Sequence, residues 1–251
     1  MSLSKNNIKS LKTLHLKKFR QKYNNFIAEG DKIVGELLQQ SKYIVQQVYA
    51  LQIWLDQNEA LLQQSGVKYQ AINEKELKLI SQLKTPNKTL AVVAMPSDNE
   101  TLETDLKSNW SIFLDGLQDP GNVGTILRIA DWFAIPNVIF GPGTVDLYNS
   151  KVLQASMGAF LRVQCASLDY NQLLALSKDI NIWIADMGDN NIFDVKIPAS
   201  GILAIGNEGK GISASLRNMN PQKVSILSPN GGAESLNAAV ATAIICAAIR
   251  R

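Results

Sequence analysis

Short apolar runs alternate with segments of helical periodicity through the second part of the chain. The apolar runs fall at residues 111–114, 137–140, 161–165, 182–185, 202–205 and 223–227. Helical patterns occupy residues 123–133, 149–159, 170–177, 214–219 and 235–249. Strands that alternate with helices form parallel sheets with helices on both faces. The pattern therefore predicts an α/β domain built on a parallel sheet.

The first part of the chain predicts a smaller α/β unit. Apolar residues recur at helical spacing in Ile8, Leu11 and Leu14. Two further helices are expected at 31–40 and 57–64, and strands at 43–51 and 90–95. The polar stretch that follows Pro96 has no apolar period and resembles a domain boundary. We therefore predict a first domain at residues 1–97, a linker at 98–109 and a second domain at 110–251.

Composition excludes several classes of protein. No apolar run approaches the roughly 20 residues of a membrane-spanning helix, and no basic-then-apolar leader opens the chain, so a cytoplasmic location is expected. Cys165 and Cys246 lie far apart, which argues against a disulfide framework or a thiolate metal cluster. His15 is the one histidine. Histidine metal sites and serine–histidine catalysis are therefore not expected, and we predict no metal.

The positive charge is concentrated at the start of the chain. The net charge is only +3, yet seven basic residues precede Glu29, the first acid: Lys5, Lys9, Lys12, Lys17, Lys18, Arg20 and Lys22. Such a cluster is typical of contact with phosphate groups of a nucleic acid. It is equally typical of a solvated helix face, and charge alone does not separate the two interpretations.

Three polar, glycine-rich segments follow predicted strands, at residues 115–124, 206–211 and 228–237. Ligands of open α/β sheets bind at the carboxyl ends of the strands, so the three segments predict one composite site. A dinucleotide-binding glycine pattern is missing after the strand at 111–114, where Gly121 and Gly124 have the wrong spacing. No nucleotide-triphosphate loop is present either.

The same segments resemble the three motifs of the SpoU/TrmH branch of the SPOUT RNA methyltransferases. The motifs lie at residues 119–128, 207–213 and 234–237, the last followed by an alanine-rich helix. Residues 155–159 also fit the family, so the resemblance covers residues 110–251. Residues 26–30 are similar to part of the family's substrate-binding domain, which has a ribosomal-protein-like fold.

The resemblance implies a deep trefoil knot in the second domain, an exception to the usual unknotted topology. It implies transfer of a methyl group from S-adenosylmethionine to a ribose 2′-hydroxyl of structured RNA, rRNA more than tRNA. It also implies a homodimer formed through helices beside the knot, with each active site completed near the partner chain. The family usually has an Ile-Pro pair entering the third motif, whereas here Leu227-Ser228-Pro229 places the proline one position later.

Carried onto this chain, the resemblance assigns roles to particular residues. The cofactor contacts would fall on Gly206, Leu227 and Leu236, with Leu203, Ile205 and Asn207 as neighbours. The proposed catalytic set is Arg128, Asn122, Glu208, Ser235 and Asn237.

Each of these polar residues also has a purely structural interpretation. Arg128 would bind the phosphate next to the reacting hydroxyl and orient that hydroxyl, because guanidinium stays protonated and cannot serve as a base. Without the motifs, a solvated position on the helix would be the favoured interpretation. Asn122 and Glu208 would hold Arg128 and the loops in register, although an acid such as Glu208 also complements a helix dipole. Ser235 and Asn237 could cap the last helix, line the pocket, or do both.

Two other classes of function stay open at this point. A non-enzymatic RNA-binding protein would explain the basic start of the chain, but it would not need three glycine-rich loops at strand ends. A dinucleotide-dependent enzyme would need affinity for NAD, which the missing glycine pattern argues against.

Overall fold

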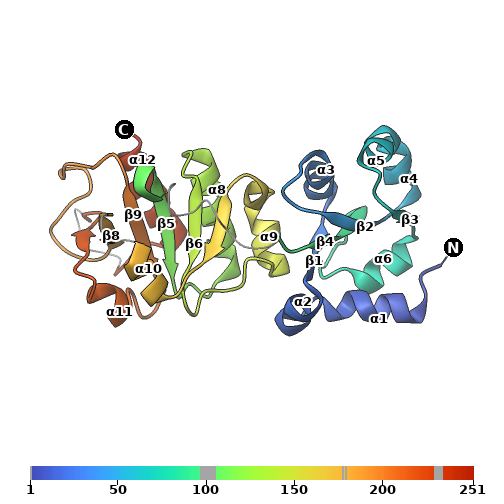
Figure 1. The fold of residues 1–251 in the computed structure, drawn as a ribbon, viewed down its shortest axis with the longest axis horizontal. Coiled ribbons are helices and arrows are strands. Elements are labelled where there is room, and N and C mark those ends of the chain that lie inside the picture. Colours follow the sequence, from blue (N-terminus) through green and yellow to red (C-terminus); the bar gives the residue numbers. More distant parts are fainter. Residues whose placement is uncertain (1, 97–105, 177, 179, 229–233) are drawn as a thin grey trace. The chain divides into compact units, whose positions relative to one another are not determined.

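The chain divides into two units, each built on its own sheet (Figure 1). The computed structural model describes residues 2–96, 106–176, 178, 180–228 and 234–251. Unit 1 comprises Met1–Ser97 and Tyr148–Gln154, and unit 2 comprises Asp98–Leu147 and Ala155–Arg251. Residues 98–105 of the predicted linker lie outside the described residues.

Unit 1 contains a mixed four-stranded sheet in the order β1-β4-β2-β3. Strand β4 is antiparallel to both β1 and β2, whereas β2 and β3 are parallel. The strands are β1 (Asn25–Glu29), β2 (Val45–Ala50), β3 (Tyr69–Ala71) and β4 (Thr89–Ala94). The helices are α1 (Lys5–Thr13), α2 (Lys17–Tyr23), α3 (Asp31–Gln39), α4 (Gln52–Gln57), α5 (Glu59–Ser65) and α6 (Glu74–Ile80).

Unit 2 contains a six-stranded sheet in the order β10-β8-β9-β5-β6-β7. Every neighbouring pair of strands in it is parallel, which confirms the predicted parallel sheet. The strands are β5 (Trp110–Asp115), β6 (Asn137–Phe140), β7 (Gln164–Ser167), β8 (Ile182–Ala185), β9 (Gly201–Gly206) and β10 (Gln222–Val224).

Helices and buried side chains cover both faces of this sheet. The helices of this unit are α8 (Pro120–Trp132), α10 (Tyr170–Leu176), α11 (Ala214–Arg217) and α12 (Ala238–Ile249), whereas α9 (Ser150–Ser156) has most of its residues in unit 1. On one face, Phe113 and Ala204 pack with Leu173 of α10 and Leu216 of α11. The alternate residues Ile112, Leu114, Leu203 and Ile205 are buried as well, and α12 packs against α8 and β9. No helix in the described part of the chain is long and apolar enough to span a membrane.

Several element boundaries differ from the sequence prediction. The strand expected at 161–165 begins at Gln164, because Ala159–Leu161 form a 3-10 turn whose apolar side chains are buried without being extended. The strand expected at 223–227 is only β10. The last helix begins at Ala238 instead of residue 235, because the side chain of Asn237 caps it.

A candidate active site at the carboxyl ends of the parallel strands

A cavity of about 380 Å³ lies at the carboxyl ends of strands β8, β9 and β10. Since these strands are parallel, their last residues meet at one edge of the sheet, and the first turns of α12 form the remaining wall. Its lining combines residues that end the strands with residues that open the helix: Ala185, Asp186, Met187, Ile205, Gly206, Asn207, Glu208, Gly211, Val224, Ser225, Ile226, Ser235, Leu236, Asn237, Ala238, Ala241 and Ile245.

The loop after β9 folds back on itself through Asn207. The backbone of Asn207 pairs with Gly211 in both directions, at 3.1 and 2.8 Å. Its Oδ1 accepts hydrogen bonds from the amides of Gly209 and Lys210, both at 3.0 Å. A Cβ at Gly206 would lie 2.5 Å from the carbonyl carbon of Gly211. Glycine is therefore required at 206 by the tight closure of this loop.

Buried Asp115, the last residue of β5, ties the same loop to the sheet. Its Oδ2 accepts a hydrogen bond from the amide of Ser213 at 2.7 Å, and its Oδ1 accepts one from the hydroxyl of Tyr170 at 2.7 Å. Burial, together with the nearby Asp115 carboxylate, raises the pKa of Tyr170, so this hydroxyl keeps its proton and remains a donor. In the sequence, Asp115 is visible only as a carboxylate at the end of an apolar strand, a pattern that predicts no particular role for it.

Side-chain amides link the three glycine-rich segments. Nδ2 of Asn122 donates to Oε1 of Glu208 at 3.0 Å, and Oδ1 of Asn122 accepts from Nδ2 of Asn237 at 2.9 Å. The start of α8 is fixed in turn by Asp119, whose Oδ1 accepts from the amide of Asn122 at 2.9 Å. One asparagine on the first segment therefore connects the second and third segments.

The structure brings together most, but not all, of the residues singled out from the sequence. Those in the cavity lining are Ile205, Gly206, Asn207, Glu208, Ser235, Leu236 and Asn237. Leu203 is buried inside the sheet and Leu227 is half exposed, and neither lines the cavity. Arg128 is exposed on α8 and makes no hydrogen bond or ion pair within the described residues. Part of the third segment, residues 229–233, lies outside the described residues.

Sequence reasoning missed several lining residues, because they directly follow β8 and β10 and lie outside the three glycine-rich segments. Asp186 follows β8 and accepts a hydrogen bond from Nη1 of Arg217 at 2.7 Å. Burial alone would raise the pKa of Asp186, but the bond from Arg217 and the amide of Met187 outweigh it and lower that pKa, which keeps the carboxylate ionised. The hydroxyl of Ser225 is buried and makes no hydrogen bond within the described part of the chain.

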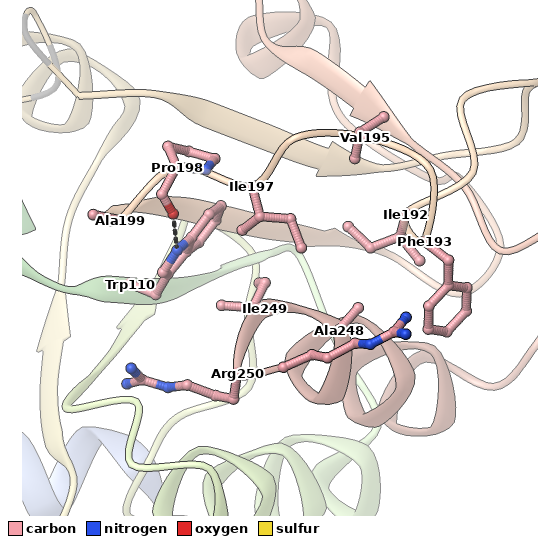
Figure 2. A pocket seen from close by; sticks show the side chains of 11 residues that line it. Trp110, Ile192, Phe193, Val195, Ile197, Pro198, Ala199, Ala248, Ile249 and Arg250 are labelled. Atoms are coloured by element: carbon pink, nitrogen blue, oxygen red, sulfur yellow. Dashed lines mark hydrogen bonds between the residues drawn. The ribbon is translucent and has the colours of Figure 1, made fainter.

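A second cavity, of about 460 Å³, lies near the amino ends of β5 and β9 (Figure 2). The indole N–H of Trp110 donates to the carbonyl of Pro198 at 3.0 Å there, and the other walls are mainly apolar. The guanidinium of Arg250 donates hydrogen bonds to the carbonyls of Phe133 and Ala134, the two residues that follow α8. No acidic, cysteine or histidine side chain belongs to this lining, so the first cavity is the better candidate for chemistry. Among the described residues, no group of three or more histidine, cysteine or acidic side chains is placed to hold a metal ion.

Comparison with known proteins agrees with this geometry. Residues 109–247 match the SpoU rRNA Methylase family, and residues 5–91 match the MRM3-like substrate binding domain. The chain is 31% identical to 23S rRNA (guanosine(2553)-2′-O)-methyltransferase RlmP of Bacillus subtilis, over 95% of this chain and 93% of that one.

Solved structures show the same fold. A protein from Porphyromonas gingivalis, assigned to the TrmH family of RNA methyltransferases, is 34% identical with a TM-score of 0.85, over 99% of this chain and 98% of that one. The SpoU methyltransferase AviRb from Streptomyces viridochromogenes, in complex with the cofactor AdoMet, is 22% identical with a TM-score of 0.84, over 98% and 97%. The present chain belongs to the SpoU rRNA methylase family.

Proposed function

We propose that this protein transfers a methyl group from S-adenosylmethionine to a ribose 2′-hydroxyl of rRNA. The observation that carries the proposal is the strand-end cavity whose surrounding loops are linked through Asn122. The near full-length similarity to an enzyme named for 2′-O-methylation of 23S rRNA supports the same reaction and substrate. Because the proposed substrate is rRNA, we expect the protein to act in the cytoplasm.

The residues of the cavity fit S-adenosylmethionine. The volume of about 380 Å³ lies within the range of small-molecule sites. Ile205, Ile226 and Leu236 offer apolar walls. The hydroxyl of Ser225, which has no hydrogen-bond partner among the described residues, offers a polar contact. The carboxylates of Asp186 and Glu208 carry the charge that complements a sulfonium cation.

The proposed cofactor contacts follow from this lining. We place them at Ile205, Gly206, Asn207 and Leu236, and we add Ile226 because it lines the cavity, whereas Leu203 and Leu227 do not. S-adenosylmethionine would supply a methyl group activated by its sulfonium centre, and the neutral thioether S-adenosylhomocysteine would be the leaving group. The chain's own task is then to align the ribose hydroxyl with that methyl group, since a single displacement depends chiefly on positioning.

Two groups of residues would perform the alignment. Asn122, Glu208 and Asn237 hold the three loops in register through hydrogen bonds of 2.9 to 3.0 Å. Arg128, exposed and without an intramolecular partner in the described part of the chain, is available to bind the RNA phosphate next to the reacting hydroxyl. The hydroxyl proton would leave to that phosphate or to water, because guanidinium is already protonated.

We further propose the trefoil knot of the family in unit 2. The strand order places β8 and β10 on one side of β9, and β5, β6 and β7 on the other. The chain then returns from β10 across the sheet, so that α12 packs on α8 and Asn237 bonds to Asn122. This return of the C-terminal segment to the first loop is the arrangement that a knot in this sheet requires.

We propose a homodimer formed through α8 and α12. The two helices pack against each other, yet they leave large apolar side chains in solvent. Trp132 of α8 is 84% exposed and Val240 of α12 is 48% exposed. Exposed apolar surface of this kind marks contact with another protein chain, and a second copy of the same family member is the expected partner.

Methyl transfer tests the proposed function directly. Purified protein is incubated with labelled S-adenosylmethionine and with unmodified rRNA or tRNA, and the RNA is then digested to locate the label. Label on a ribose of rRNA is the expected result. Label on a base would contradict the proposed reaction, and label on tRNA alone would contradict the proposed substrate. A protein that binds RNA but does not bind S-adenosylhomocysteine in a calorimeter would be an RNA-binding protein without this activity.

A further inference from the structure

Helix α2 displays an aromatic surface among lysines at the start of unit 1. The rings of Phe19 and Tyr23, one helical turn apart, are stacked with centroids 6.1 Å apart and planes 9° from parallel. Tyr23 is 48% exposed. The pair therefore leaves aromatic surface in solvent, and aromatic surface gains free energy when a partner covers it.

Lysine side chains lie against these rings. The Nζ of Lys18 lies 4.8 Å from the centroid of Phe19, and the Nζ of Lys22 lies 5.4 Å from the centroid of Tyr23. Together with exposed Lys17 they carry three positive charges on seven residues. None of these lysines forms a salt bridge within the described ranges. The carboxylate of Glu29, the first acid of the chain, accepts hydrogen bonds from the hydroxyl of Ser81 and the amide of Gln82.

The surface is held rigidly in place. The guanidinium of buried Arg20 donates to the carbonyls of Leu14 and His15 at 3.1 and 2.9 Å, which fixes the corner between α1 and α2. Helix α1 precedes α2 along the same side of unit 1 (Figure 1). Its exposed lysines Lys5, Lys9 and Lys12 recur at helical spacing and therefore extend the positive charge along one face.

We infer that α2 binds an unpaired stretch of RNA, with a nucleobase stacked on Tyr23 and the backbone phosphates held by Lys17, Lys18 and Lys22. An aromatic face next to cations is the combination that recognises single strands, because each base offers a π-face and each nucleotide a negative charge. Duplex RNA hides its bases and cannot stack on Tyr23. The inference rests on the proposed function only in taking RNA as the substrate, and it concerns a surface separate from the methyl-transfer cavity.

The test measures stacking in the full-length protein. The probe is a single-stranded RNA of about ten nucleotides, within the size range of single-strand sites, that contains the fluorescent base 2-aminopurine. Tyr23→Ala should weaken binding about ten-fold, as expected for the loss of one stacked base, and should abolish quenching of the probe. Tyr23→Phe should keep both. Tyr69→Ala is the matched control, because Tyr69 is equally exposed on β3, and it should change neither.

A second pair of variants tests the phosphate contacts. Lys18→Gln combined with Lys22→Gln should lower the slope of log affinity against log salt by about 1.4, or about 0.7 for each lost phosphate contact to a single strand. Lys75→Gln combined with Lys78→Gln, on exposed positions of α6, is the control and should leave the slope unchanged.

The outcomes separate this inference from the proposed function. Equal binding by Tyr23→Ala and wild type, or equal affinity for the strand and for its duplex, would overturn the inference while methyl transfer could still occur. Tighter binding of an acidic peptide than of the RNA strand would assign α2 to a protein partner and would also overturn it. Quenching that depends on Tyr23 in a protein that methylates no RNA would support the inference and contradict the proposed function. An unchanged melting temperature and circular dichroism spectrum show that each variant is folded.

Discussion

Asn237 has two roles that can be separated by choice of side chain. Its Oδ1 accepts from the amides of Ala239 and Val240 at 2.9 and 3.2 Å and so caps α12, while its Nδ2 donates to Asn122 at 2.9 Å. Aspartate retains the acceptor and complements the helix dipole, but it cannot donate. We predict that Asn237→Asp keeps the stability of wild type and loses methyl transfer.

Asn237→Ala removes both roles. We expect it to lose about 1 kcal/mol of folding stability, the usual effect of removing a helix cap, in addition to the loss of activity. Thermal unfolding and methyl transfer are measured on both variants. If Asn237→Asp retained full activity, the bond between Asn237 and Asn122 would have no part in positioning the loops.

Arg128 gives a test of phosphate binding, because within the described residues it has no structural partner to lose. We predict that Arg128→Lys lowers turnover about ten-fold, because lysine cannot reproduce a bidentate, charge-assisted bond worth about 1.5 kcal/mol or more. The melting temperature and the affinity for S-adenosylhomocysteine should not change. Arg251→Lys, at the exposed end of the chain, serves as control. Near-full turnover of Arg128→Lys would exclude this role.

At the scale of elements, the sequence predicts those whose signal is local. Strands β5, β6, β8 and β9 fall within one residue of their predicted limits, because each is a single apolar run that ends in polar residues. Apolar character alone does not distinguish a strand from a buried 3-10 turn. For this reason the sequence places the start of β7 at residue 161, whereas the strand begins at Gln164. Strands β1 and β3 and helices α2, α4 and α6 were missed, because each is seven residues or shorter and gives only a weak periodic signal.

The corner between α1 and α2 should depend on pH through His15. Burial lowers the pKa of His15; the carbonyl of Ile80, 3.0 Å from Nε2, acts in the opposite direction, and the charges of Arg20 and Lys12 lower it further. A histidine whose pKa is lowered by folding stabilises the fold above its ordinary pKa of about 6.5 and loses that contribution as the pH falls through the lowered value.

We therefore predict that the melting temperature of wild type falls more steeply below about pH 6.5 than that of His15→Gln, whose amide is neutral and can still donate to Ile80. Thermal unfolding at about pH 7.5 and about pH 5.5 measures the difference. Parallel curves for the two proteins would mean that His15 titrates alike in the folded and unfolded chains.

At the scale of the whole molecule, the sequence predicts which loops come together better than it predicts which residues line the cavity. The three glycine-rich segments are visible as motifs, and side chains from all three meet at Asn122. Asp186, Met187 and Ile226 reach the same cavity only because β8 and β10 lie beside β9 in the sheet. Strand order depends on the packing of segments far apart in the chain, and single-sequence periodicity does not record it.

The proposed homodimer predicts how substitutions on the exposed apolar face of α8 and α12 change the mass of the protein in solution. Light scattering should give twice the mass of the chain for wild type. Trp132→Glu combined with Val240→Glu should give a monomer, because charged side chains would be buried at the interface without partners. Leu79→Glu, on an exposed apolar position of α6, is the control and should leave the mass of wild type. A monomeric wild-type protein at working concentration would contradict the proposal.

Arg128 does not line the cavity of its own chain. In the proposed dimer, it could instead bind RNA at the cavity of the partner chain. We predict that mixing two inactive variants restores part of the activity: Arg128→Ala, which keeps the cofactor loops, and Gly206→Ala, whose added Cβ would prevent the loop after β9 from closing. If Arg128 acts across the interface, a mixed dimer contains one cavity with both an intact loop and a partner arginine. If it acts within its own chain, every cavity in the mixture lacks one of the two, and mixing restores nothing.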